Sequence, residues 1–262
     1  MGLTIEHDLH IHSNLSLCAR AEMTFENIAS AARSRGFAVI GVCDHTDVVG
    51  DWERERRLLR NFDLARRAAR GSGLRILVGS EVTMLAPGKV AISADTARQL
   101  DYVSVATNHY HLPEVQHPCD RTARGYARHH LEILESICDL DWADIVAHPF
   151  LSGFIKDVQF GQEEFFQAID EERLKELLGR LGKRNIRLEL NPRVPAERTD
   201  FFRRVVEMGR EAGVRFSLGS DAHTLSEACF GDSLGTAEAL EEIGASQSDF
   251  DLGDLAKRGV AS

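Results

Sequence analysis

The sequence has no apolar run long enough to cross a membrane, and its N-terminus has no basic region followed by an apolar stretch. Positive charge is also in short supply, since 31 Lys and Arg residues stand against 41 Asp and Glu residues, for a formal net charge of −10. Proteins that bind the phosphate backbone of nucleic acids rely on clustered Lys and Arg. We therefore expect a cytoplasmic protein with no membrane partner and no obligate nucleic-acid partner.

Paired cysteines are absent as well. The five cysteines are scattered, form no C-x-x-C pair, and stand at positions 18, 43, 119, 138 and 229. An odd, scattered set is typical of reduced thiols rather than of a disulfide scaffold. This usage agrees with a cytoplasmic location.

Apolar strand patterns alternate with helical patterns along the whole chain. We expect strands at residues 5–12, 38–43, 74–82, 102–106, 144–147, 186–190 and 214–218, and helices that begin near residues 24, 51, 122, 171, 200 and 233. Residues 152–166 form a longer connection with weak signals. Strands that alternate with helices form a parallel sheet with right-handed crossovers. The pattern predicts one α/β domain over residues 1–262, a TIM-like barrel of seven units, with an open doubly wound sheet as the alternative.

The first predicted strand carries the stretch Asp8-Leu9-His10-Ile11-His12-Ser13. Because side chains alternate along a strand, we expect Asp8, His10 and His12 on one face and Leu9 and Ile11 on the other. Two imidazoles on one strand face can bind one metal ion. An isolated H-x-H is a weak signal, so its meaning depends on what the other strands provide.

Polar residues also stand at the end of every other predicted strand. They are Asp44 and His45, Glu81, His109, His148, Asn191, and Asp221 with His223. Parallel barrels build their active sites at this carboxyl end of the strands. Burying so many imidazoles and carboxylates together is unfavourable unless cations bind them. One ion of four to six ligands cannot use the whole set, so we expect two or three divalent ions, either Zn, Mn or Fe.

The predicted ligands divide into three groups. The first ion would be held by His10, His12, Glu81 and Asp221, and Glu81 would bridge to a second ion at His109 and His148. His45 and His223 would serve a third ion. Asp8 and Asp44 would either orient the imidazoles from behind or make ordinary turn and strand-end hydrogen bonds.

In this order the motifs resemble those of the PHP (polymerase and histidinol phosphatase) superfamily. The resemblance spans residues 8–223 and rests on the start Asp8-x-His10-x-His12-Ser13, Asp44-His45, Glu81, His109, His148-Pro149, and the end Ser220-Asp221-Ala222-His223. It implies a distorted seven-stranded (β/α)7 barrel with a site for two or three metal ions. It also implies phosphoester hydrolysis by a hydroxide that bridges two ions.

One position departs from the family pattern. Many similar members have a histidine eight residues after the first motif histidine, as a ligand of the third ion, and this chain has Cys18 there. A thiolate can bind zinc or iron, which makes Cys18 a candidate ligand. The alternative is a small buried hydrophobic residue.

The implied reaction needs a proton donor for the leaving alkoxide. Either Asp44 or His223 is expected to donate that proton, unless a metal-held water does. The substrate would be a small phosphorylated metabolite or a nucleotide, cleaved as a phosphatase or a phosphodiesterase would cleave it.

Phosphate also needs an anchor outside the metal site. Arg193 follows the sixth predicted strand directly and is the preferred anchor, because a guanidinium can bind phosphate through two nitrogens. Arg20 and Lys89 are weaker candidates. His111 and His117 follow the fourth predicted strand, where they would shape substrate access or simply be exposed.

Two other functions stay open from the sequence. A metal-dependent amidohydrolase also begins with H-x-H on a barrel strand, but this chain has no evident lysine at a strand end to serve as a carboxylated bridge. A non-catalytic metal-binding PHP module is the second alternative. Such modules tend to lose ligands, whereas this chain keeps nearly all of them.

Overall fold

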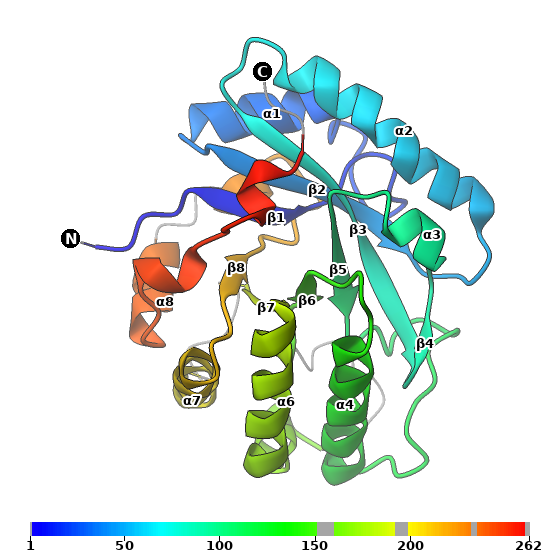
Figure 1. Cartoon of the computed structure of the whole chain (residues 1–262), viewed down its shortest axis with the longest axis vertical. Coiled ribbons are helices and arrows are strands. Elements are labelled where there is room, and N and C mark those ends of the chain that lie inside the picture. The colour runs from blue at the N-terminus through cyan, green and yellow to red at the C-terminus, as the bar shows by residue number, and fades with distance from the viewer. Residues whose placement is uncertain (1, 151–159, 192–198, 232–234, 260–262) are drawn as a thin grey trace.

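Seven parallel strands form a single sheet that curves into a nearly closed barrel (Figure 1). The computed structural model describes residues 2–150, 160–191, 199–231 and 235–259. The strands follow the order β1 (His7–Ile11), β2 (Val39–Thr46), β3 (Arg75–Ala86), β5 (Tyr102–Ala106), β6 (Ile145–Ala147), β7 (Arg187–Leu190) and β8 (Phe216–Leu218). The short β4 (Lys89–Val90) pairs antiparallel with β3. The predicted distorted barrel is therefore confirmed, and the open sheet is not observed.

The barrel closes between β1 and the segment that follows β8. Ile11 and Ala222 form an isolated parallel bridge, in which the His12 amide donates to the Ala222 carbonyl at 3.0 Å. The Ala222 amide donates in turn to the carbonyl of His10 at 3.3 Å. These contacts bring the end of the chain's last strand against its first polar motif.

Helices connect most of the strands and pack on the outside of the barrel (Figure 1). They are α1 (Phe25–Ser34), α2 (Trp52–Ala69), α3 (Ala94–Ala97), α4 (Ala123–Cys138), α5 (Gln162–Gln167), α6 (Glu171–Arg184), α7 (Thr199–Glu211) and α8 (Thr236–Glu242). Thr24 caps α1, because its side chain accepts a hydrogen bond from the Asn27 amide, and the helix begins near residue 24 as expected. Helix α5 lies in the connection where the sequence pattern was too weak to predict one. None of the described helices is long and apolar enough to span a bilayer.

Strand β1 does not alternate as the sequence pattern predicted. Its register against β2 shifts between Asp8 and Ile11, as at a β-bulge. Leu9 packs in the small inner cluster with Tyr102, whereas Ile11 packs in the large core shared with the helices. Leu9 and Ile11 therefore do not share a face, and the expectation that they do is wrong.

The inner cluster fills the amino end of the barrel. Leu9, Cys43, Leu77, Tyr102 and Ile145 come from five strands and pack with Leu252 and Leu255 of the C-terminal segment. That segment also contacts residues at the start of several strands, since Arg258 hydrogen-bonds Asp101 and Asp144, Arg75 hydrogen-bonds Lys257, and Arg187 hydrogen-bonds Leu252. The amino end is covered in this way, and the carboxyl end carries the polar residues.

Tyr102 is the largest apolar side chain of this inner cluster. Its hydroxyl donates to the carbonyl of Leu9 at 2.7 Å, and its ring lies against Gly41 and Gly79. A Cβ atom at Gly79 would come within 2.5 Å of the ring. Glycine is required here because two strands must leave room for the ring.

We expect Gly79→Ala to lower the free energy of unfolding by about 1–3 kcal/mol, because the added methyl overpacks the barrel interior. Gly179→Ala is the matched control, since Gly179 lies in α6 with no atom within 4 Å of an added Cβ. That control should raise the free energy of unfolding by about 0.5–1 kcal/mol. Urea denaturation measures both, and equal stability of the two variants would contradict the packing argument.

Candidate metal centre

The buried carboxylate of Glu81, in β3, lies at the middle of the polar cluster. Its Oε1 atom is 2.7 Å from Nε2 of His148 and 3.1 Å from Nε2 of His109. Its Oε2 atom is 2.9 Å from Nδ1 of His45 and 3.4 Å from Nε2 of His10. The two oxygens thus face different imidazoles, which is the arrangement a bridging carboxylate needs.

Three groups of ligand atoms lie close enough together to hold a cation. They are His10, Glu81, His148 and Asp221; His45, Glu81 and His109; and His12, His45 and His223, with the ligand atoms of each group within 4.8 Å of one another. All eight residues were predicted as ligands from the sequence. These groups place His148 with His10 and Asp221, but the expected neighbours are close as well: Nε2 of His12 lies 3.1 Å from Oδ1 of Asp221 and 3.5 Å from Oε2 of Glu81.

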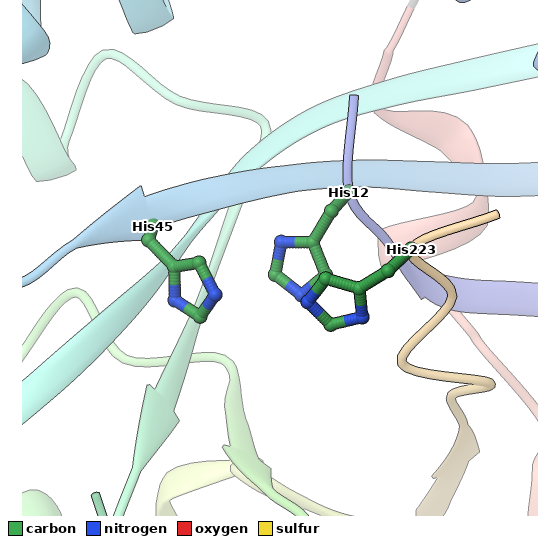
Figure 2. A group of neighbouring side chains, drawn as sticks. All are labelled: His12, His45 and His223. Atoms are coloured by element: carbon green, nitrogen blue, oxygen red, sulfur yellow. The ribbon is translucent and has the colours of Figure 1, made fainter. Parts of the chain in front are cut away.

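The third group consists of imidazoles only (Figure 2). The ring of His12 stacks on that of His45 and on that of His223, with 4.4 Å between ring centroids in each pair. His12 leaves β1, His45 lies near the end of β2, and His223 follows β8. The contacts that close the barrel therefore also assemble this group, and His12 lies between it and the group of His10, since its Nε2 is 3.1 Å from Asp221.

Three buried atoms at the centre are placed to bind a cation. Nε2 of His10 lies 3.4 Å and Nδ1 of His45 lies 2.9 Å from Oε2 of Glu81, yet none of these atoms has the geometry of a hydrogen bond to a described residue. A buried polar atom without a partner is unfavourable, and a divalent ion between a nitrogen and a carboxylate oxygen would satisfy both. The donor set of imidazole nitrogen and carboxylate oxygen also fits zinc, manganese or iron.

The electrostatics of the cluster keep its carboxylates charged. Burial alone would raise the pKa of Glu81, but the imidazoles of His45, His109 and His10 hold that pKa well below its usual range. The pKa of Asp221 is lowered in the same way, against burial, by its hydrogen bond with His12 and by the charge of His10. Burial and the neighbouring His45 lower the pKa of His12 to about 3, so its imidazole is neutral and offers a lone pair.

Glu189, in β7, is a functional residue that the sequence analysis missed. Its Oε2 atom is 2.7 Å from Nδ1 of His10, and its Oε1 atom accepts from the His148 amide at 3.3 Å. A proton on Nδ1 of His10 leaves Nε2 free to bind a metal ion. The pair fits only because residue 219 is glycine, whose added Cβ would lie 2.5 Å from the Glu189 carboxyl carbon.

A hydrogen bond with Thr83 orients the imidazole of His109. The Thr83 hydroxyl donates to Oδ1 of Asp47 at 2.7 Å and lies 2.8 Å from Nδ1 of His109. Because the hydroxyl proton is directed to Asp47, Nδ1 of His109 donates to the Thr83 oxygen. In that tautomer Nε2 of His109 carries no proton, and its lone pair faces Glu81.

Asp8 and Asp44 do not take part in orienting the imidazoles. Asp8 accepts hydrogen bonds from the amides of His10, Ser220 and Cys229. Asp44 accepts from the amide and hydroxyl of Ser13 and from the side chains of Ser16 and Asn61. Of their two expected roles, ordinary strand-end and turn hydrogen bonding is the one observed.

The remaining predicted site residues lie around the mouth or outside the described residues. Cys18 is exposed; partial burial would raise the pKa of its thiol, but the neighbouring side chains of His223 and His45 lower that pKa to about 7, so Cys18 is not a buried hydrophobic residue. His111 lines a pocket beside His109, whereas His117 hydrogen-bonds Tyr126.

Two of the three predicted phosphate anchors are among the described residues, and both are exposed. Arg20 is exposed, and its amide donates to the His223 carbonyl. Lys89 is exposed in β4. Arg193 and Pro192 fall in the segment 192–198, outside the described residues, whereas Asn191 is described and buried.

A comparison with protein families finds a match over most of the chain. The model of the PHP domain matches residues 8–193. The chain belongs to the PHP domain family. The Asp221-x-His223 motif lies beyond the matched segment and joins the cluster through the closure of the barrel. No curated protein sequence matches the chain.

Solved structures resemble this PHP chain in fold. Histidinol phosphate phosphatase from Lactococcus lactis, complexed with zinc, L-histidinol and phosphate, superposes with a TM-score of 0.63 at 13% identity, covering 91% of this chain and 92% of that one. A Listeria monocytogenes protein described as a histidinol phosphatase superposes with a TM-score of 0.57 at 15% identity, covering 84% and 96% of the two chains. At these identities the similarity shows the barrel fold.

We expect Glu189→Gln to weaken binding of the metal ion at His10 by about 10- to 100-fold, since a neutral amide replaces the carboxylate that orients the imidazole. Isothermal titration calorimetry of zinc into the metal-free protein measures this affinity. Glu163→Gln, an exposed substitution in α5, is the matched control and should bind zinc as the unaltered protein does. Unchanged affinity in folded Glu189→Gln would show that the contact with His10 is dispensable.

The position of Cys18 leads to a prediction on thiol labelling. If its thiolate binds the ion held by His12, His45 and His223, zinc should slow alkylation of Cys18 by at least about tenfold, because a metal-bound thiolate is a poor nucleophile. Cys119 is the internal control, since it is the other exposed cysteine. Mass spectrometry of the two labelled peptides gives both rates. Equal protection of both cysteines, or protection of neither, would remove Cys18 from the ligand set.

Proposed function

We propose that this PHP domain is a metal-dependent phosphoesterase that hydrolyses a phosphoester of a small metabolite or a nucleotide. The observation that supports this most is the carboxylate of Glu81, whose two oxygens face different imidazole groups at the carboxyl end of the barrel. A carboxylate placed in this way would hold two cations close together. Two adjacent cations suit the displacement of an alcohol from phosphorus, where both the attacking and the leaving oxygen need stabilisation.

The proposed cofactors are two or three divalent ions of zinc, manganese or iron. When bound, such ions supply a water activated near neutral pH and positive charge for the phosphate oxygens. The eight clustered residues would hold them, and Cys18 would join His12, His45 and His223 at the third. The Lactococcus lactis protein of the same fold contains zinc together with phosphate, which supports zinc as one suitable ion.

The chain's own groups determine how the leaving oxygen receives its proton. His223 is only partly buried, with a side chain 28% exposed, and Nδ1 of its ring donates to the Asp221 carbonyl at 2.9 Å. Burial opposes protonation, but the contact with Cys18 and the charge of Asp221 raise its pKa above the usual value. Asp44 already accepts four hydrogen bonds, from the amide and hydroxyl of Ser13 and from the side chains of Ser16 and Asn61. We therefore favour His223 over Asp44 as the proton donor when its Nε2 is not a ligand.

The proposed substrate is small because the chain offers little positive charge. The net charge of −10 disfavours a polyanion such as a long nucleic acid. No membrane partner is proposed either, and the proposed location is the cytoplasm. The amidohydrolase alternative predicts turnover of amides or lactones instead, which a substrate panel separates.

We expect His10→Ala and Asp221→Ala to lower the turnover of a phosphomonoester by at least about 10³-fold, because each removes a ligand from the central group. Asp141→Ala, an exposed carboxylate paired with Arg98, is the control and should keep full activity. Elemental analysis of each variant must accompany the rates. A metal-replete His10→Ala or Asp221→Ala protein with a near-normal rate would refute the mechanism.

The same panel distinguishes the alternatives. Hydrolysis of amides or lactones without hydrolysis of phosphate esters would favour an amidohydrolase. A fully metallated chain that hydrolyses no tested ester or amide would favour a non-catalytic metal-binding module.

A further inference from the structure

A pocket of about 160 Å³ opens directly beside the metal centre. Its inner wall is formed by His45 and His109, which with Glu81 make up one of the candidate metal groups. Leu17 and Leu112 contribute the apolar part of its lining. A phosphoester bound at the metal centre would therefore have room in this pocket for the group attached to its phosphate.

Exposed apolar side chains are concentrated at the same place. Among the described residues, the large hydrophobic side chains that are exposed are Leu15, Leu17, Val48, Val49 and Trp52. Leu15 and Leu17 follow β1, Val48 and Val49 follow β2, and Trp52 begins α2, so all five lie at the carboxyl end of the barrel. Of these, Leu17 lines the pocket and is 92% exposed. Apolar surface concentrated in this way on a soluble barrel indicates a binding site.

The loop that presents Leu17 is firmly attached to the barrel. Asp44, in β2, accepts hydrogen bonds from Ser13 at 2.8 Å and from the Ser16 hydroxyl at 2.7 Å. The Ser16 oxygen also accepts from the His45 amide at 3.4 Å. The apolar wall is thereby held in a fixed position next to the metal centre, before any substrate binds.

The charges of the pocket are already compensated within the protein. Arg54, which lines the pocket, pairs with Asp47 at 3.2 Å and with Asp51 at 3.9 Å. Asp47 also accepts the hydrogen bond of Thr83. The guanidinium and the carboxylate therefore offset each other's charge, which makes the pocket less attractive to a second phosphate or to an ammonium group.

We propose that this pocket binds the leaving group of the substrate, and that this group is a compact, uncharged apolar alcohol of about the size of one ring. The inference rests on the proposed phosphoesterase function. The pocket is smaller than the roughly 300–1,000 Å³ typical of sites for larger ligands, which excludes a dinucleotide from it. In the reaction the phosphorus–oxygen bond to the alcohol breaks and a bond from the water oxygen to phosphorus forms. One water proton goes to the alkoxide and the other stays on the phosphate.

The discriminating experiment compares 2-phenylethyl phosphate, 2-hydroxyethyl phosphate and L-histidinol phosphate on the metal-loaded protein. All three release an alkoxide, so differences in kcat/KM report binding of the rest of the leaving group. We expect kcat/KM for the phenylethyl ester to exceed that for each of the other two by at least about tenfold. Equal values, or a preference for L-histidinol phosphate, would overturn the inference while leaving the phosphoesterase function intact.

Leu17→Ala tests whether Leu17 forms the apolar wall of the pocket. The preference for the phenylethyl over the hydroxyethyl ester should fall by about tenfold, since the apolar contact is lost from an exposed side chain whose removal does not disturb the core. Val49→Ala is the matched control, because Val49 is also exposed and does not line the pocket. A preference that is unchanged in Leu17→Ala, or lowered equally in both variants, would contradict the assignment.

A binding measurement separates this inference from the proposed function. Calorimetry compares 3-phenylpropylphosphonate with 3-hydroxypropylphosphonate, which cannot be hydrolysed, on the metal-loaded protein. Tighter binding of the phenyl compound by at least about tenfold, with loss of that preference in Leu17→Ala, supports the apolar pocket even if no ester is hydrolysed. Equal affinity of the two phosphonates would overturn it.

Discussion

The buried carboxylate of Glu81 is the interaction on which the rest of the site depends. Removing a carboxylate from water is strongly unfavourable unless it is paired and hydrogen-bonded. Imidazoles from four strand ends, those of His10, His45, His109 and His148, lie within 3.4 Å of its oxygens. Their protons, or the cations that replace them, offset the cost of burial. The strands can bring these rings together only if the barrel closes, so the fold and the centre stabilise each other.

Closure in turn depends on a filled amino end. The Tyr102 ring occupies the space left by Gly41 and Gly79, and the C-terminal segment covers the starts of the strands. The bulge in β1 directs Leu9 into this inner cluster while His10 reaches Glu189 and Glu81. One irregularity in one strand therefore serves both the packing of the barrel and the geometry of the metal centre.

The barrel and the polar cluster at its carboxyl end could be predicted from the sequence because both follow simple rules. Buried parallel strands are continuous apolar runs, and polar residues at their carboxyl ends must converge. His148 and His223 were found by this rule alone. The way in which the imidazoles share the two oxygens of Glu81 could not be found, since it depends on the bulge in β1 and on the curvature of the sheet. Glu189 was missed for a related reason, because in the run Ile-Arg-Leu-Glu-Leu nothing local distinguishes a carboxylate that enters the barrel from one that faces solvent.

The loop after β1 connects metal binding with substrate preference, two properties of the site that could otherwise vary independently. It carries Cys18 beside the imidazoles of His45 and His223, and Leu17 at the wall of the adjoining pocket. Asp44 holds this loop through Ser13 and Ser16. Loss of activity on substitution of Asp44 would therefore not identify a proton donor, because the same change releases both a candidate ligand and the apolar wall. Rate alone cannot distinguish a proton donor from a residue that holds the loop. Metal content and substrate preference can, because both change when the loop moves.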